Sequence, residues 1–109
     1  MSNTVIEMAD IQLAEGRTEA DLLNASERFQ RDFLSEQPGF VARELVRKSD
    51  GSYADIVWWE NEEAALAILQ KAENSEDCRT YFSVMKMNPG NPSEGVEHFA
   101  VLAGYARVG

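Results

Sequence analysis

The chain has 109 residues, of which 44% are hydrophobic, and a formal charge of −9 from 10 basic and 19 acidic residues. This length predicts one domain, residues 1–109, and the acidic balance disfavours nucleic acid and anionic membranes as partners, because both require a basic patch. The single cysteine, Cys78, excludes an internal disulfide. We expect neither a signal peptide nor a membrane span, so we predict a cytoplasmic protein.

The first two predicted elements are a strand and a helix. Residues 4–13 combine Val and Ile with alternating polar residues, which predicts a strand. Thr18, with Asp21 three residues later, is typical of a helix N-cap, and the helix is expected to run to about Glu36. Its apolar residues form one stripe that needs a sheet to cover it: Leu22, Ala25, Phe29 and Phe33.

Residues 37–60 predict a β-hairpin that follows a chain reversal at Pro38-Gly39. Asp50-Gly51 supplies the positive φ values of a tight turn. Both faces of the hairpin mix apolar and charged residues, which predicts that both are covered, and Trp58 and Trp59 point to opposite faces. A loop of two or four residues predicts which residues of the two strands pair. On one face the pairs are Lys48 with Tyr53, Val46 with Asp55, Glu44 with Val57 and Ala42 with Trp59. On the other face they are Leu45 with Ile56 and Arg43 with Trp58, and the latter pair is placed for a cation–π contact.

Two further helices and a strand are predicted after the hairpin. Asn61 is a plausible N-cap for a helix over residues 62–72, and Ser75 caps a short amphipathic helix after it. Residues 88–92 form a turn-rich loop, and residues 96–108 read as a long final strand with Gly104 as a bulge or bend.

The order β, α, β, β, α, β predicts an α+β, ferredoxin-like fold. The third strand then lies between the first two in a four-stranded antiparallel sheet, and the helices cover one face. A sheet with a bare apolar second face predicts association, and a homodimer with its two sheets face to face fits best.

The pattern resembles the dimeric α/β-barrel superfamily and, within it, the antibiotic-biosynthesis-monooxygenase-like domains. The resemblance spans Thr4 to about Leu102 and is carried by short motifs: Pro38-Gly39-Phe40, Asp50-Gly51, residues 55–60 (DIVWWE) and residues 63–65 (EAA). It implies a face-to-face dimer that forms a dimeric α/β barrel and, in many members, a cavity between helices and sheet. Members of the family include cofactor-independent oxygenases of aromatic polyketides, haem-degrading oxygenases and many proteins without an assigned activity.

The haem-degrading branch uses an asparagine on the first strand, a tryptophan near the end of the third strand and a histidine on the following helix. Trp59 is similar in position to that tryptophan. Residues 61–72 contain no histidine, however, and only Asn3 stands near the first strand. The resemblance therefore disfavours haem degradation.

His98, the only histidine, is the candidate catalytic base or proton shuttle. The alternative is a half-buried strand histidine that bonds a neighbour. The candidate ligand-binding residues, each of which also suits a plain structural role, are Trp59, Tyr53, Asp55, Tyr81 and Phe82. Cys78 is expected to be a buried structural thiol. No metal-ligand spacing or glycine-rich phosphate loop occurs, so we expect no metal and no cofactor.

Two functions remain open from the sequence. The first, which rests on the resemblance, is a homodimeric, cofactor-free, monooxygenase-like protein that binds a small aromatic or apolar metabolite and oxidises it. The second is a non-catalytic ligand-binding or stress-related dimer whose residues serve only packing. The fold tolerates both, because similar folds carry many functions.

Overall fold

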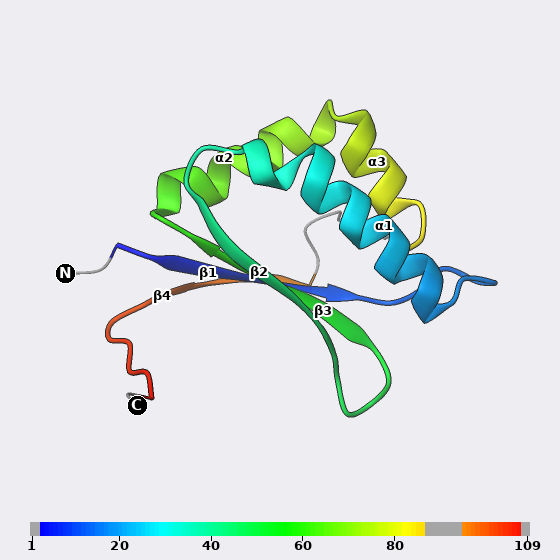
Figure 1. The fold of residues 1–109 in the computed structure, drawn as a ribbon, viewed down its shortest axis with the longest axis horizontal. Coiled ribbons are helices and arrows are strands. Elements are labelled where there is room, and N and C mark those ends of the chain that lie inside the picture. The colour runs from blue at the N-terminus through cyan, green and yellow to red at the C-terminus, as the bar shows by residue number, and fades with distance from the viewer. Residues whose placement is uncertain (1–2, 87–94, 108–109) are drawn as a thin grey trace.

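The computed structural model describes residues 3–86 and 95–107. Its sheet has four strands in the order β2-β3-β1-β4, and every neighbouring pair is antiparallel. Figure 1 shows the helices on one side of this sheet, as the predicted ferredoxin-like fold requires. The elements in chain order are β1 (Val5–Ile11), α1 (Glu19–Asp32), the short 3-10 helix η1 (Leu34–Glu36), β2 (Phe40–Arg47), β3 (Tyr53–Trp59), α2 (Glu62–Glu73), α3 (Glu76–Phe82) and β4 (Val96–Ala100).

The helices begin where the sequence predicts them. The Thr18 hydroxyl accepts from Asp21 N at 3.2 Å, and the Asp21 carboxylate accepts from Thr18 N at 3.0 Å, which completes a capping box. The side chains of Asn61 and Ser75 cap α2 and α3 by accepting from Ala64 N and Cys78 N, without the reciprocal bond of a capping box. The first helix ends earlier than predicted, at Asp32, and η1 follows it. Pro38 explains why the helical backbone does not pass Glu36, because the residue before a proline is driven into extended backbone, as Gln37 is.

The predicted pairing of β2 with β3 is wrong by one residue. The loop has three residues, closed by a bond from Lys48 N to the Ser52 carbonyl at 2.7 Å, with Gly51 at φ +90°. A one-residue shift turns every side chain of a strand to the other face of the sheet. The observed pairs are Arg47 with Tyr53, Val46 with Ala54, Leu45 with Asp55, Glu44 with Ile56, Arg43 with Val57, Ala42 with Trp58 and, after a bulge, Phe40 with Trp59.

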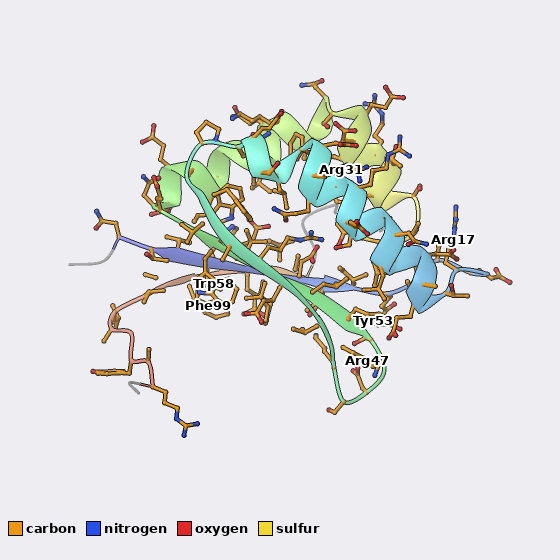
Figure 2. The ribbon with its side chains drawn as sticks, viewed as in Figure 1. Arg17, Arg31, Arg47, Tyr53, Trp58 and Phe99 are labelled. Atoms are coloured by element: carbon orange, nitrogen blue, oxygen red, sulfur yellow. The ribbon has the colours of Figure 1, made fainter. Side chains whose placement is uncertain are left out.

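This register moves Arg43 to the helix side of the sheet. The predicted Arg43–Trp58 contact is therefore wrong, and the Arg43 guanidinium lies instead over the rings of Phe29 and Tyr81, at 5.4 and 5.2 Å. The predicted separation of Trp58 from Trp59 is correct. Trp58 lies on the face away from the helices, close to Phe99 (Figure 2), because both residues stand opposite Ile6.

The reversal before β2 depends on Gly39. Its φ is +81°, which L side chains rarely adopt, and a Cβ built on it would lie 2.5 Å from the Ala64 Cβ. The Gly39 carbonyl also accepts from Glu60 N at 2.8 Å. The turn is thus pressed against the start of α2, so both the backbone conformation and the space require glycine.

The final strand is shorter than predicted and ends at Ala100. Just beyond it, Val101 N donates to the Thr4 carbonyl at 3.0 Å. Residues 101–107, with Gly104, instead run away from the sheet (Figure 1), and Leu102 and Tyr105 are 95% and 94% exposed. The predicted loop at residues 88–92, and Val108, lie outside the described residues. Within the described ranges, no helix is both long and apolar enough to cross a membrane.

Candidate functional site

Trp59 closes β3 on the helix side of the sheet and is only 1% exposed. Val5 stands opposite it on β1, and the Phe40 ring meets its indole edge-on at a centroid distance of 5.9 Å. The indole Nε1 is buried and has no hydrogen-bond partner among the described residues. A buried donor without an acceptor is rare in proteins and costs free energy, so this N–H is a candidate contact for a bound molecule.

Glu7 lies next to Trp59 and links it to His98. It is the inward-facing residue in the middle of β1, opposite Val57 on β3 and His98 on β4. The His98 Nε2 is 3.6 Å from Glu7 Oε1, an ion-pair distance that is too long for a hydrogen bond. Like Trp59 Nε1, Glu7 Oε1 is buried and makes no well-formed hydrogen bond among the described residues, although the indole N–H lies close enough to lower the pKa of the carboxyl. The structure thus brings Trp59 and His98 together around a carboxylate.

The environment of Glu7 suits proton chemistry. Burial raises the pKa of its carboxyl above the usual value, and Asp55 adds to this effect, whereas His98 and the Trp59 N–H oppose it. A carboxyl group with a raised pKa is a better proton acceptor near neutral pH. The exposed fractions of the His98 and Glu7 side chains are 29% and 14%, so His98 is the more accessible of the two.

The sequence reasoning did not single out Glu7, although a signal was present. The alternating positions of β1 that face the helices are Val5, Glu7, Ala9 and Ile11, so Glu7 is the one charge in an otherwise apolar set. A charged side chain at an inward position needs a partner or a function. A charged residue in this otherwise apolar set therefore identifies Glu7 from the sequence, provided that the inward face of β1 is known.

Asp55 and Tyr81 belong to a second polar cluster around Arg43. The Asp55 Oδ1 accepts from Arg43 Nε at 3.1 Å, and Oδ2 accepts from the Tyr81 hydroxyl at 2.7 Å. Arg43 also donates to Tyr81 Oη at 2.7 Å and to Ser26 Oγ at 2.8 Å. Burial raises the pKa of Asp55, opposed by Arg43, and burial together with the charge of Asp55 raises that of Tyr81.

Bonds within the protein occupy both carboxylate oxygens of Asp55 and the Tyr81 hydroxyl. The ligand-binding roles of these two residues stay predictions. Phe82 lies half-buried next to Tyr81, with ring centroids 6.1 Å apart. Tyr53 lies apart from both clusters, at the hairpin end of β3 near Arg47 (Figure 2).

Cys78 is fully buried, and burial raises the pKa of its thiol, as a structural role requires.

An open groove of about 630 Å³ lies between α1 and β2. It is lined by Leu23, Ser26, Glu27, Gln30, Phe40, Ala42, Arg43 and Leu45. None of the predicted site residues is among these. Over the described ranges, no three His, Cys, Asp or Glu side chains gather in a way that would hold a metal ion.

Solved structures of known proteins match this fold over nearly its whole length. A protein from Bordetella bronchiseptica, provisionally assigned as an antibiotic biosynthesis monooxygenase, has a TM-score of 0.74 at 21% identity and covers 94% of this chain and 100% of its own. This chain has the fold of the antibiotic-biosynthesis-monooxygenase-like proteins. SnoaB, a cofactor-independent oxygenase from Streptomyces nogalater, has a TM-score of 0.67 at 20% identity and covers 96% of this chain and 97% of its own.

A haem-degrading protein from Mycobacterium tuberculosis also shares the monooxygenase-like fold, with a TM-score of 0.59 at 18% identity over 98% of this chain and 100% of its own. No protein-family model and no curated protein matches the sequence. The resemblance drawn from the hairpin motifs is thus confirmed at the level of fold.

Proposed function

We propose that this chain is a homodimeric protein that binds a small aromatic or apolar metabolite between helices and sheet and oxidises it without a cofactor. The observation that carries the proposal is the buried Trp59 with its unpaired indole N–H, in a fold shared with a cofactor-independent oxygenase. His98 stands two strands away on the same face, with Glu7 on the strand between it and Trp59. Without a cofactor, the ligand itself supplies the electrons that reduce O₂, which favours electron-rich hydroxylated aromatics.

Ligand binding is tested by tryptophan fluorescence with one indole at a time. Trp58→Phe leaves Trp59 as the reporter, and Trp59→Phe leaves Trp58, which lies on the other face of the sheet. We expect 1-naphthol and 1,8-dihydroxyanthrone to quench the Trp58→Phe protein saturably and to leave the Trp59→Phe protein unchanged. Equal quenching of both variants, or none in either, contradicts a site at Trp59.

Turnover is tested by O₂ uptake and product absorbance with 1,8-dihydroxyanthrone. Loss of a general base typically lowers the rate by about 10²–10⁴-fold, so we expect His98→Ala to lower kcat within that range while the protein stays dimeric. Unchanged turnover in His98→Ala removes this residue from the mechanism. Saturable quenching of Trp59 without any O₂ uptake in the wild type favours the non-catalytic binding protein instead.

A further inference from the structure

The outer side of β2 is an open edge of the sheet. In the strand order β2-β3-β1-β4, β2 pairs only with β3 among the described residues. A strand in this position presents a row of unpaired N–H and C=O groups, which is a template for pairing with another chain. Val41 on β2 is an apolar side chain that is 54% exposed. The edge therefore offers both backbone hydrogen bonds and apolar surface to an added strand.

The segment after β4 has the sequence of a strand but lacks a partner. The sequence predicts a strand over residues 96–108, whereas pairing with β1 ends at Ala100. Residues 101–107 (VLAGYAR), which we call the arm, leave the sheet (Figure 1). Leu102 and Tyr105 on the arm are the two most exposed large hydrophobic residues of the described chain. Exposed apolar side chains of this size favour association with another surface.

The groove between α1 and β2 suits one face of the arm. Successive side chains of a strand point to opposite faces, so Tyr105 and Arg107 share one face and Leu102 lies on the other. A tyrosine has an apolar ring and a hydroxyl group that needs a polar partner when it is buried. The groove provides both kinds of surface, with apolar walls and a polar side: Leu23, Phe40, Ala42 and Leu45, and Ser26, Glu27, Gln30 and Arg43.

Charge favours the orientation in which Tyr105 faces the groove. The whole chain carries −9, whereas the one charged residue of the arm is Arg107. Glu27 lines the groove and is exposed, so Arg107 then lies on the side of an acidic residue. Leu102 points to the opposite side, toward the face of the sheet that carries Trp58. Each of the two exposed side chains is thus covered by a different apolar surface.

We propose that the arm of one subunit pairs with the outer edge of β2 in a second copy of the chain and places its Tyr105 in that copy's α1–β2 groove. Phe40 lines the groove and packs edge-on against Trp59 at 5.9 Å, so the arm covers a wall of the proposed ligand site. That site is therefore complete only in the dimer. This inference rests on the homodimer of the proposed function, and strand addition at a sheet edge supplies its main-chain hydrogen bonds.

Disulfide trapping tests where the arm binds. Leu23 lines the groove and is 53% exposed, so Leu23→Cys in one chain and Tyr105→Cys in another bring two thiols within reach if the arm enters the groove. The two variants are refolded together under reducing conditions and then oxidised, and the fully buried Cys78 does not compete. We expect a covalent dimer from the mixture and none from either variant alone.

Leu66→Cys is the matched control for Leu23→Cys. Leu66 is 46% exposed on α2 and does not line the groove. Its mixture with Tyr105→Cys should therefore give no covalent dimer under the same conditions.

Variants of Tyr105 measure how much the arm contributes to association. Tyrosine is enriched among the side chains that dominate interface affinity, so we expect Tyr105→Ser to raise the Kd of the dimer about 30-fold. Tyr105→Phe keeps the ring and should change it less than about threefold. Because Tyr105 is 94% exposed within its own subunit, circular dichroism should show an unchanged fold. Analytical ultracentrifugation measures the Kd.

The remaining outcomes separate the arm from the dimer itself. If the wild type is dimeric but the Leu23→Cys mixture forms no more covalent dimer than the Leu66→Cys mixture, the arm does not occupy the groove. An unchanged Kd in Tyr105→Ser overturns the proposal in the same way, and in both cases the homodimer stands. If the wild type is monomeric at micromolar concentration, the homodimer of the proposed function fails and this inference falls with it.

Discussion

Arg43 connects both layers of the fold through a single side chain. Its guanidinium bonds Asp55 on β3, Ser26 on α1 and Tyr81 on α3, and its own side chain is only 5% exposed. Taking two charges out of water is costly, and the hydrogen bonds around the pair compensate for that cost. The pair therefore fixes the positions of α1 and α3 over the sheet rather than adding much net stability.

We expect Arg43→Met to lower the free energy of unfolding by about 3–5 kcal/mol, because it leaves Asp55 buried without its partner. Adding Asp55→Leu should recover part of this loss, since the orphaned charge is then removed. Urea unfolding measures both effects.

Arg47→Met is the matched control for Arg43→Met. It breaks the ion pair between Arg47 and Glu19, whose side chains are 63% and 38% exposed, respectively. Water screens an exposed pair, so we expect a change close to experimental error. Equal losses in Arg43→Met and Arg47→Met would contradict a buried role for Arg43.

At the scale of elements, the hairpin shows what the sequence predicts and where prediction ends. Periodicity and caps were sufficient for the order of strands and helices, because they depend on neighbouring residues such as Thr18 and Asp21. The register of β2 depends on whether the loop has two, three or four residues, and Asp50-Gly51 suits more than one of these lengths.

That single uncertainty decides the composition of the Arg43 cluster, because it determines which face of the sheet receives Arg43. The actual loop, with Gly51 at φ +90°, places Arg43 beside Asp55. The Glu7 pairing is a different case, since it needs the register of β1 against both β3 and β4. These contacts join residues far apart in the chain, and local patterns do not specify them.

Two glycines, in the turns on either side of β2, allow the effects of backbone strain and of crowding to be separated. Gly51 and Gly39 both have positive φ, but a Cβ at Gly51 meets nothing within 4 Å, whereas one at Gly39 lies 2.5 Å from the Ala64 Cβ. We expect Gly51→Ala to cost about 1–2 kcal/mol from backbone strain alone. Gly39→Ala should cost about 1–3 kcal/mol more, because α2 must also move.

Thermal or urea unfolding of both variants measures the difference. Combining Gly39→Ala with Ala64→Gly removes the clash and should recover part of the loss, although glycine near the start of α2 has its own cost. If Gly39→Ala lowers the free energy of unfolding no more than Gly51→Ala does, the close approach of this turn to α2 is not rigid. The packing of the neighbouring Phe40 against Trp59 is then looser than described.

At the scale of the whole molecule, the two faces of the sheet differ in what covers them. Helices cover the face with Glu7 and Trp59, and no part of the described chain packs over the other face (Figure 1). Apolar side chains from all four strands lie on that open face: Ile6, Met8, Val46, Ile56, Trp58 and Phe99. Leu102 and Tyr105 extend beyond it with over nine-tenths of their surfaces exposed. An apolar surface of this kind favours association.

We therefore expect the protein to be a dimer at micromolar concentration, with the open faces of two sheets in contact. Trp58→Glu places a charge among the apolar side chains of the open face and should weaken the dimer by about 30-fold or more. The fold should survive, because Trp58 lies outside the layer that the helices cover. Light scattering during size exclusion measures the mass, and circular dichroism checks the fold.

Leu66→Glu is the matched control for Trp58→Glu, since Leu66 is 46% exposed on α2, in the helix layer away from the open face. It introduces the same charge into a chain that already carries −9, so it separates a local effect from general repulsion between acidic subunits. Dissociation by Trp58→Glu alone supports the sheet-to-sheet dimer. A wild type that is monomeric, or equal dissociation by both variants, contradicts it and leaves the open face for a different partner.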